Sequence, residues 1–154
     1  MMARDLQPLM AQIAAHARST YPSECCGLVI EDAARSLRFV AIPNIAGTAA
    51  AAGNSRRSGR DGYVMDPKAL LDELASAEQS GGRLAAIVHS HPDVGAYFSP
   101  EDREMALGGG TEPLWPGVQY LVVSCKDTGV DAARLFTWDA PRGDFAEEQV
   151  PVTI

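Results

Sequence analysis

The chain has 154 residues, of which 46% are hydrophobic and 21% are charged, a balance that is typical of a globular protein and excludes wholesale disorder. A chain of this length normally forms one domain with one core, so we predict that residues 1–154 form a single domain. The formal net charge of −7 would repel a polyphosphate backbone, which argues against nucleic acid as a partner.

The sequence also carries no pattern that is typical of secretion or of a membrane protein. Its N-terminus lacks the continuous apolar core of a signal peptide, and no apolar run approaches the ~18 residues that a membrane span needs. The odd number of cysteines, three, and the adjacency of Cys25 and Cys26 argue against a disulfide framework. We therefore expect a reduced, cytoplasmic protein with no membrane partner, whose cysteines are small buried hydrophobic residues.

The first part of the chain predicts one helix, two strands and a long loop. Apolar residues at helical spacing indicate an amphipathic helix over residues 6–20, which Pro22 closes. Short runs over residues 25–30 and 37–41 are typical of neighbouring strands. Residues 46–62 lose all periodicity and are rich in Ala, Gly, Ser, Asn and Arg, so we expect a long surface loop, of a kind that is often functional.

The second part of the chain alternates between helical and strand patterns. Pro67 begins an amphipathic helix, and residues 84–90 form a nearly continuous apolar run, typical of a strand that is covered on both faces. A second short helix should begin at Pro100, and residues 118–125 and 132–138 read as two strands of a hairpin. Interleaved helices and strands predict the α/β class: a single layered domain with a mixed central β-sheet flanked by helices.

The stretch His89-Ser90-His91-Pro92 is the most informative part of the sequence. On a strand, residues i and i+2 face the same side at roughly 6.6 Å along the chain, so both imidazoles can converge on one metal ion. Pro92 should end the strand there, which would place the pair at a sheet edge beside a loop. Asp102 follows and can present its carboxylate from the first turn of the next helix.

Two histidines, one aspartate and a water molecule form the open tetrahedral set of a catalytic zinc site, whereas closed structural sites use four protein ligands. Magnesium and calcium prefer shells made of oxygen alone. Each residue also has a simpler interpretation, and the residues alone leave both open. The histidine pair can arise by chance, and Ser99 with Asp102, separated by Pro100, matches a helix-capping box.

The histidine stretch, followed at this spacing by Ser99 and Asp102, resembles the JAMM motif of the MPN-plus zinc metalloproteases. Other segments resemble the bacterial branch of that family, so that the resemblance extends from about residue 6 to about residue 150. These segments are Tyr21-Pro22-Ser23-Glu24-Cys25-Cys26-Gly27-Leu28, Pro43-Asn44, Met65-Asp66-Pro67 and Tyr120-Leu121-Val122-Val123-Ser124. The resemblance also implies a fold similar to that of cytidine deaminases.

The resemblance implies a role for each residue of the motif and one Zn²⁺ per chain. His89, His91 and Asp102 become the zinc ligands, Glu24 the general acid/base, and Ser99 the hydroxyl that supports the oxyanion. Glu24 would take a proton from the attacking water and pass it to the leaving amine, so the implied reaction is hydrolysis of an amide or isopeptide bond. The local sequence alone does not distinguish Glu24 from a surface glutamate.

The resemblance also implies a protein substrate. Members of the family cleave at the C-terminal tail of ubiquitin-like proteins, and the bacterial branch includes peptidases that act on a sulfur-carrier protein ending in Gly-Gly. Arg56, Arg57 and Arg60 form a basic island in an acidic chain. This island is either a solvated loop or a docking surface for an acidic ubiquitin-like partner, since opposite charge steers encounter.

Two other functions compete with this interpretation. Relatives of the family that have lost their ligands serve as non-catalytic scaffolds or binding modules, which the intact set of ligands argues against. Zinc nucleobase deaminases require His-x-Glu followed by Pro-Cys-x-x-Cys. This sequence has His-Ser-His and no Cys-x-x-Cys, so we do not expect a deaminase.

Overall fold

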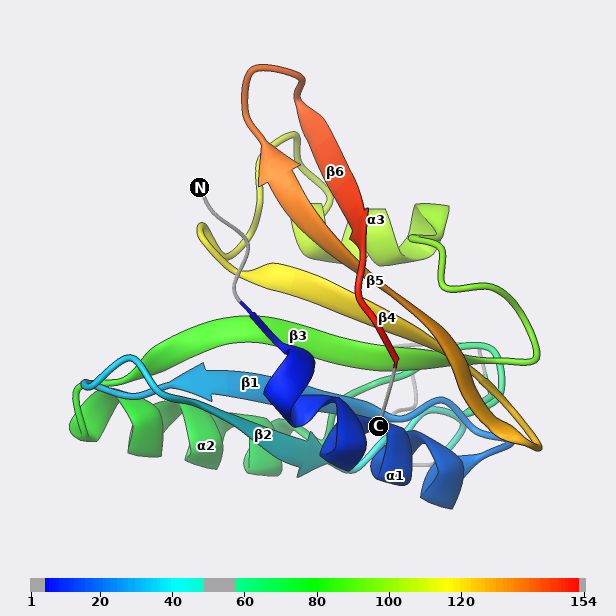
Figure 1. The fold of residues 1–154 in the computed structure, drawn as a ribbon. Helices are drawn as coiled ribbons and strands as arrows, with labels where there is room; N and C mark the ends of the chain where they lie inside the picture. Colours follow the sequence, from blue (N-terminus) through cyan, green and yellow to red (C-terminus); the bar gives the residue numbers. More distant parts are fainter. Residues whose placement is uncertain (1–4, 49–57, 153–154) are drawn as a thin grey trace.

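The computed structural model describes residues 5–48 and 58–152. Within these ranges the chain forms three α-helices, a short 3₁₀ helix and one six-stranded sheet (Figure 1). The elements in chain order are the 3₁₀ helix Gln7–Leu9, α1 Met10–Thr20, β1 Cys26–Glu31, β2 Leu37–Ile42, α2 Pro67–Gln79, β3 Arg83–Pro92, α3 Pro100–Leu107, β4 Gln119–Lys126, β5 Gly129–Asp139 and β6 Asp144–Gln149.

The sheet is mixed, as the sequence predicts. Its strand order is β2-β1-β3-β4-β5-β6; β3 and β4 run parallel, and all other neighbouring strands are antiparallel. The predicted hairpin joins β4 to β5, with Lys126 opposite Gly129. The fold class predicted from the sequence is therefore confirmed.

Helices cover both faces of this sheet (Figure 1). One core cluster lies between α1 and the sheet and includes Ile13 and Val88. The other lies on the opposite face, against α2 and α3, and includes Ala77 and Ile87. Because Ile87 and Val88 are consecutive in β3, they point to opposite faces, which explains why this strand is apolar along its length.

The sheet differs from the sequence-based prediction at two points. Pro92 ends β3, as predicted, but β3 is not an edge strand, because β1 and β4 flank it. The histidine pair therefore lies at the carboxyl end of a central strand. The sequence also gave no sign of β6, in which only Phe145 is buried, so that its apolar pattern is too weak to indicate a strand.

Three other expectations concern the burial of the cysteines, helices that could cross a membrane, and the loop over residues 46–62. Cys25, Cys26 and Cys125 are all buried and free, as expected. None of the described helices is long and apolar enough to cross a membrane. Most of the predicted loop over residues 46–62 lies outside the described residues, and Arg56 and Arg57 lie there with it.

Candidate metal centre

The register between β1 and β3 brings Glu24 to the histidine pair. Cys26 lies opposite His89 in this antiparallel pairing, so the chain two residues earlier reaches the level of His91. Glu24 is buried there, with 5% of its surface exposed, and is not the surface glutamate that the local sequence allowed. Glu24 and the histidine pair therefore lie close together although more than sixty residues separate them in the chain.

Hydrogen bonds to the backbone fix the segment that carries Glu24. Next to it, the backbone N–H of Cys25 donates to Ser90 Oγ (2.7 Å). The side-chain amide of Asn44 donates to the carbonyl oxygens of Glu24 (3.0 Å) and Gly62 (3.2 Å). Asn44 thus connects the end of the long loop, at Gly62, to the segment that carries Glu24. The sequence indicated Asn44 only through the resemblance of Pro43-Asn44 to the family.

Asp102 occupies the first turn of α3, where a capping box holds it. Its backbone N–H donates to Ser99 Oγ (3.0 Å), and the backbone N–H of Ser99 donates to Asp102 Oδ2 (3.0 Å). Pro100 stands at the first helical position, where its missing N–H costs nothing. The capping interpretation of Ser99 and Asp102 is therefore confirmed, and the same carboxylate also faces the histidines.

Three side-chain atoms form an equilateral triangle at the centre of the site. His89 Nε2 and His91 Nε2 are 3.2 Å apart, and Asp102 Oδ2 lies 3.2 Å from each of them. A tetrahedral zinc ion with ligands at about 2.0–2.1 Å separates those ligands by about 3.3 Å. All three residues are buried, so the donor set and its spacing fit a zinc ion with a fourth position left for water.

Glu24 lies beside this triangle. One carboxylate oxygen of Glu24 and one ring nitrogen from each histidine lie within 4.8 Å of one another, a grouping that could itself hold a metal ion. The equal 3.2 Å spacing of the set with Asp102 matches tetrahedral zinc more closely. Glu24 is then near enough to act on a water molecule in the fourth position.

Burial and mutual contact set the protonation states in the site. Burial lowers the pKa of His89, which keeps its imidazole neutral. Burial alone would raise the pKa of Asp102, but hydrogen bonds from the two imidazoles outweigh it and hold that pKa far below its usual range. Burial opposes protonation of His91 as well, yet the hydrogen bond and charge of Asp102 raise its pKa. A neutral imidazole and an ionised carboxylate are the forms that bind metal.

The triangle lies at one side of an open cavity of about 350 Å³. Residues from four separate segments line it, among them Glu24, Arg60, His91, Tyr97, Ser99 and Asp102. Arg60 is exposed at its rim. The structure thus places Glu24, Arg60, His91, Ser99 and Asp102 around one cavity, and the fully buried His89 contacts His91 and Asp102.

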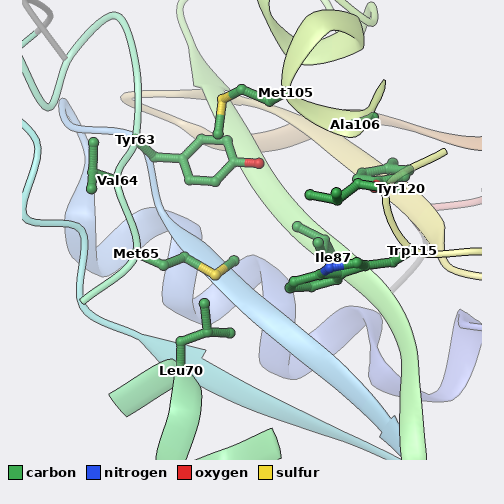
Figure 2. Close-up of a pocket in the computed structure, with 10 residues that line it drawn as sticks. Tyr63, Val64, Met65, Leu70, Ile87, Met105, Ala106, Trp115 and Tyr120 are labelled. Atoms are coloured by element: carbon green, nitrogen blue, oxygen red, sulfur yellow. The ribbon is translucent and has the colours of Figure 1, made fainter. Parts of the chain in front are cut away.

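A second cavity, of about 310 Å³, adjoins the site and is mainly apolar (Figure 2). Tyr63, Met105, Trp115 and Tyr120 are among its walls. The ring of Tyr63 stacks on His89, with centroids 4.8 Å apart and planes 29° from parallel. The sequence gave no sign of this contact, because Tyr63 follows an aperiodic loop and reaches His89 only through the fold.

The fold and this donor set together define the class of the protein. Residues 6–139 match the family described as prokaryotic homologs of the JAB domain, and the chain belongs to this family. The family resemblance seen in the sequence is thereby confirmed.

Two named relatives are similar to the chain. Desampylase of Haloferax volcanii is 29% identical over 131 residues, which cover 85% of this chain and 79% of that protein. A probable TtuB-protein conjugate cleaving protease of Thermus thermophilus is 38% identical over 74 residues, which cover 48% of this chain and 41% of that protein.

Solved structures support the fold. The solution structure of a Salinibacter ruber protein matches with a TM-score of 0.58 and 24% identity over 93% of this chain and 86% of that one. The solution structure of a Desulfitobacterium hafniense protein matches with a TM-score of 0.63 and 24% identity over 94% of this chain and 88% of that one.

Proposed function

We propose that the protein is a zinc-dependent peptidase or isopeptidase that hydrolyses an amide bond at the C-terminal tail of a ubiquitin-like or sulfur-carrier protein. The observation that carries this proposal is the triangle of two Nε2 atoms and one Oδ2 atom, each 3.2 Å from the others. It lies beside a buried glutamate and opens to a cavity. The intact set of candidate ligands argues against a non-catalytic scaffold or binding module.

In this proposal His89, His91 and Asp102 hold one zinc ion per chain. Bound zinc would lower the pKa of a coordinated water to about 7 and polarise the carbonyl group of the scissile bond. The His91 ring is already oriented for this role, because its Nδ1 lies 3.0 Å from the Gly95 carbonyl oxygen. In the zinc-bound form, an Nδ1–H donated to that oxygen would fix the ring, and Nε2, which contacts Asp102 in this structure, would give up its proton to act as a ligand.

Glu24 and Ser99 supply the groups that act on the substrate. Glu24 takes a proton from the attacking water and later gives it to the leaving amine, which its position beside the triangle allows. Ser99 Oγ accepts the N–H of Asp102 and keeps its own hydrogen for donation. That O–H is available to the oxyanion that develops on the substrate carbonyl in the shared cavity.

The protein partner follows from the relatives and from the surroundings of the site. One relative is named a probable TtuB-protein conjugate cleaving protease, and the family resemblance implies a tail ending in Gly-Gly. The apolar cavity next to the metal centre would take apolar side chains of such a tail. Arg60, at the rim of the other cavity, would attract an acidic partner, together with Arg56 and Arg57.

Zinc content and cleavage, measured on one preparation of each variant, test the proposal. The substrate is a candidate ubiquitin-like or sulfur-carrier protein joined through its C-terminal Gly-Gly to a short peptide, and mass spectrometry detects the products. We expect about one zinc per chain in the wild type, and loss of both zinc and cleavage in Asp102→Ala. Glu104→Ala is the matched control, because Glu104 is an exposed carboxylate on the same helix.

A wild-type protein that neither contains zinc nor gains it on titration would contradict the metal centre. A zinc-loaded protein that cleaves none of the conjugates would contradict the assignment of substrate and would favour the binding module instead.

A further inference from the structure

The two histidines of the triangle are held in different ways. His91 has a hydrogen-bond partner behind it, because its Nδ1 faces the Gly95 carbonyl oxygen at 3.0 Å. The Nδ1 of His89 is buried, and no described residue forms a hydrogen bond with it. Ligating histidines normally use this second nitrogen to fix the orientation of the ring. Among the described residues, the hydrogen bond that orients His91 through Nδ1 therefore has no counterpart at His89.

Tyr63 is in the right place to orient the His89 ring. Its ring stacks on the His89 ring at 4.8 Å and 29°, which is the offset face-to-face arrangement that aromatic rings favour. Tyr97 contacts His91 at almost the same distance, 4.9 Å, but its ring meets that imidazole at 61°, edge to face. Tyr97 is also half exposed, so its contact constrains the ring less.

We propose that Tyr63 is a positioning residue for the metal centre: its ring holds the His89 imidazole in the orientation that turns Nε2 toward His91 and Asp102. This inference rests on the proposed zinc site and deepens it. The flat face of the ring supports the His89 imidazole. The hydroxyl does not contribute to this support, because it points into the apolar cavity (Figure 2).

Tyr63 also lines the apolar cavity. Its ring is both the support of His89 and a wall of the apolar cavity, with Met105 and Tyr120 on the other sides (Figure 2). A substrate segment in that cavity would pack against the residue that orients a zinc ligand. The proposal therefore links the apolar cavity to the metal centre through one side chain.

Zinc affinity, measured by competition with a chromogenic chelator, tests this inference on the full chain. We expect Tyr63→Ala and Tyr63→Leu to weaken zinc binding about 10- to 100-fold, as loss of a supporting contact does at other metal sites. Tyr63→Phe should bind zinc like the wild type, because it keeps the flat face. Tyr97→Ala is the matched control and should also keep wild-type affinity, because Gly95 still holds His91.

Two further measurements distinguish a change at the metal centre from a loss of folding. Visible absorption of the Co²⁺-loaded proteins reports ligand geometry, and we expect Tyr63→Leu to change the spectrum while Tyr63→Phe leaves it unchanged. Circular dichroism of the metal-free variants reports folding; if Tyr63→Ala does not fold, Tyr63→Leu, which fills much of the same volume, decides the question.

Wild-type affinity in Tyr63→Leu, an equal loss in Tyr97→Ala, or an equal loss in Tyr63→Phe would each overturn the positioning role. These outcomes differ from failure of the proposed function, which would show as a wild-type protein that binds no zinc and would remove both proposals.

Discussion

Ser99 combines a structural contact with a proposed catalytic one, and removing its hydroxyl should separate the two. As the N-cap of α3, Ser99 accepts the Asp102 N–H at 3.0 Å, in a helix of only eight residues. Loss of such a cap typically costs about 1 kcal/mol of unfolding free energy. Loss of an oxyanion donor typically lowers turnover by about 100-fold or more. Ser99→Ala should therefore show both effects.

Two controls separate these effects. Ser99→Gly also lacks the hydroxyl, but glycine at an N-cap costs only a few tenths of a kcal/mol, so turnover should fall as in Ser99→Ala with stability nearly unchanged. Asp66→Ala removes the cap of α2, where the Asp66 side chain accepts the Lys68 N–H at 3.2 Å. That variant should lose about 1 kcal/mol of stability and keep its turnover.

The assay combines urea unfolding, zinc content and cleavage on the same preparations. Zinc content is essential, because the backbone N–H of Ser99 also contacts Asp102 Oδ2 and a disturbed turn could release the metal. Normal turnover in folded, zinc-loaded Ser99→Ala would refute the oxyanion role and leave Ser99 as a helix cap alone.

Three further predictions follow from the site and its surroundings. Glu24→Gln should keep zinc and lose hydrolysis by roughly 100- to 10,000-fold, and near wild-type turnover would remove the proposed proton shuttle. Arg60→Glu should raise KM for an acidic partner several-fold at low salt with kcat unchanged, and a difference that persists at high salt would contradict electrostatic docking. Burial raises the pKa of the Cys25 thiol to about 12 and also raises that of Cys26 and Cys125. At pH 8 these thiols stay protonated, so a disulfide reagent should titrate none in the native protein and all three after unfolding; fast native labelling would contradict this.

Local patterns in the sequence predicted most of the fold. The apolar run of β3 indicated a strand that is buried on both faces, and the structure places it between β1 and β4. The strand β6 was missed because Phe145 is its sole buried residue, and pairing with β5 rather than its own pattern makes it a strand. Strand position within the sheet was missed for the same reason: it depends on partners, which periodicity does not encode.

The candidate site likewise contains residues that local patterns predicted and residues that they did not. His89, His91 and Asp102 belong to local patterns, namely the alternation of a strand and the first turn of a helix. Glu24 and Tyr63 reach the site through contacts between distant segments, the β1–β3 register and the stacking on His89. A single sequence carries no physical signal for such contacts, so only the family resemblance pointed to Glu24, and nothing pointed to Tyr63.

The capping and metal-binding interpretations of Asp102 turn out not to compete. Its Oδ2 accepts the Ser99 N–H at 3.0 Å and stands 3.2 Å from both histidines, so one oxygen serves the helix end and the triangle together. A carboxylate fixed by a capping box loses less freedom when it binds a metal ion, because the helix has already ordered it. In the proposed metal centre, the cap would therefore help to hold Asp102 in the position from which it binds zinc.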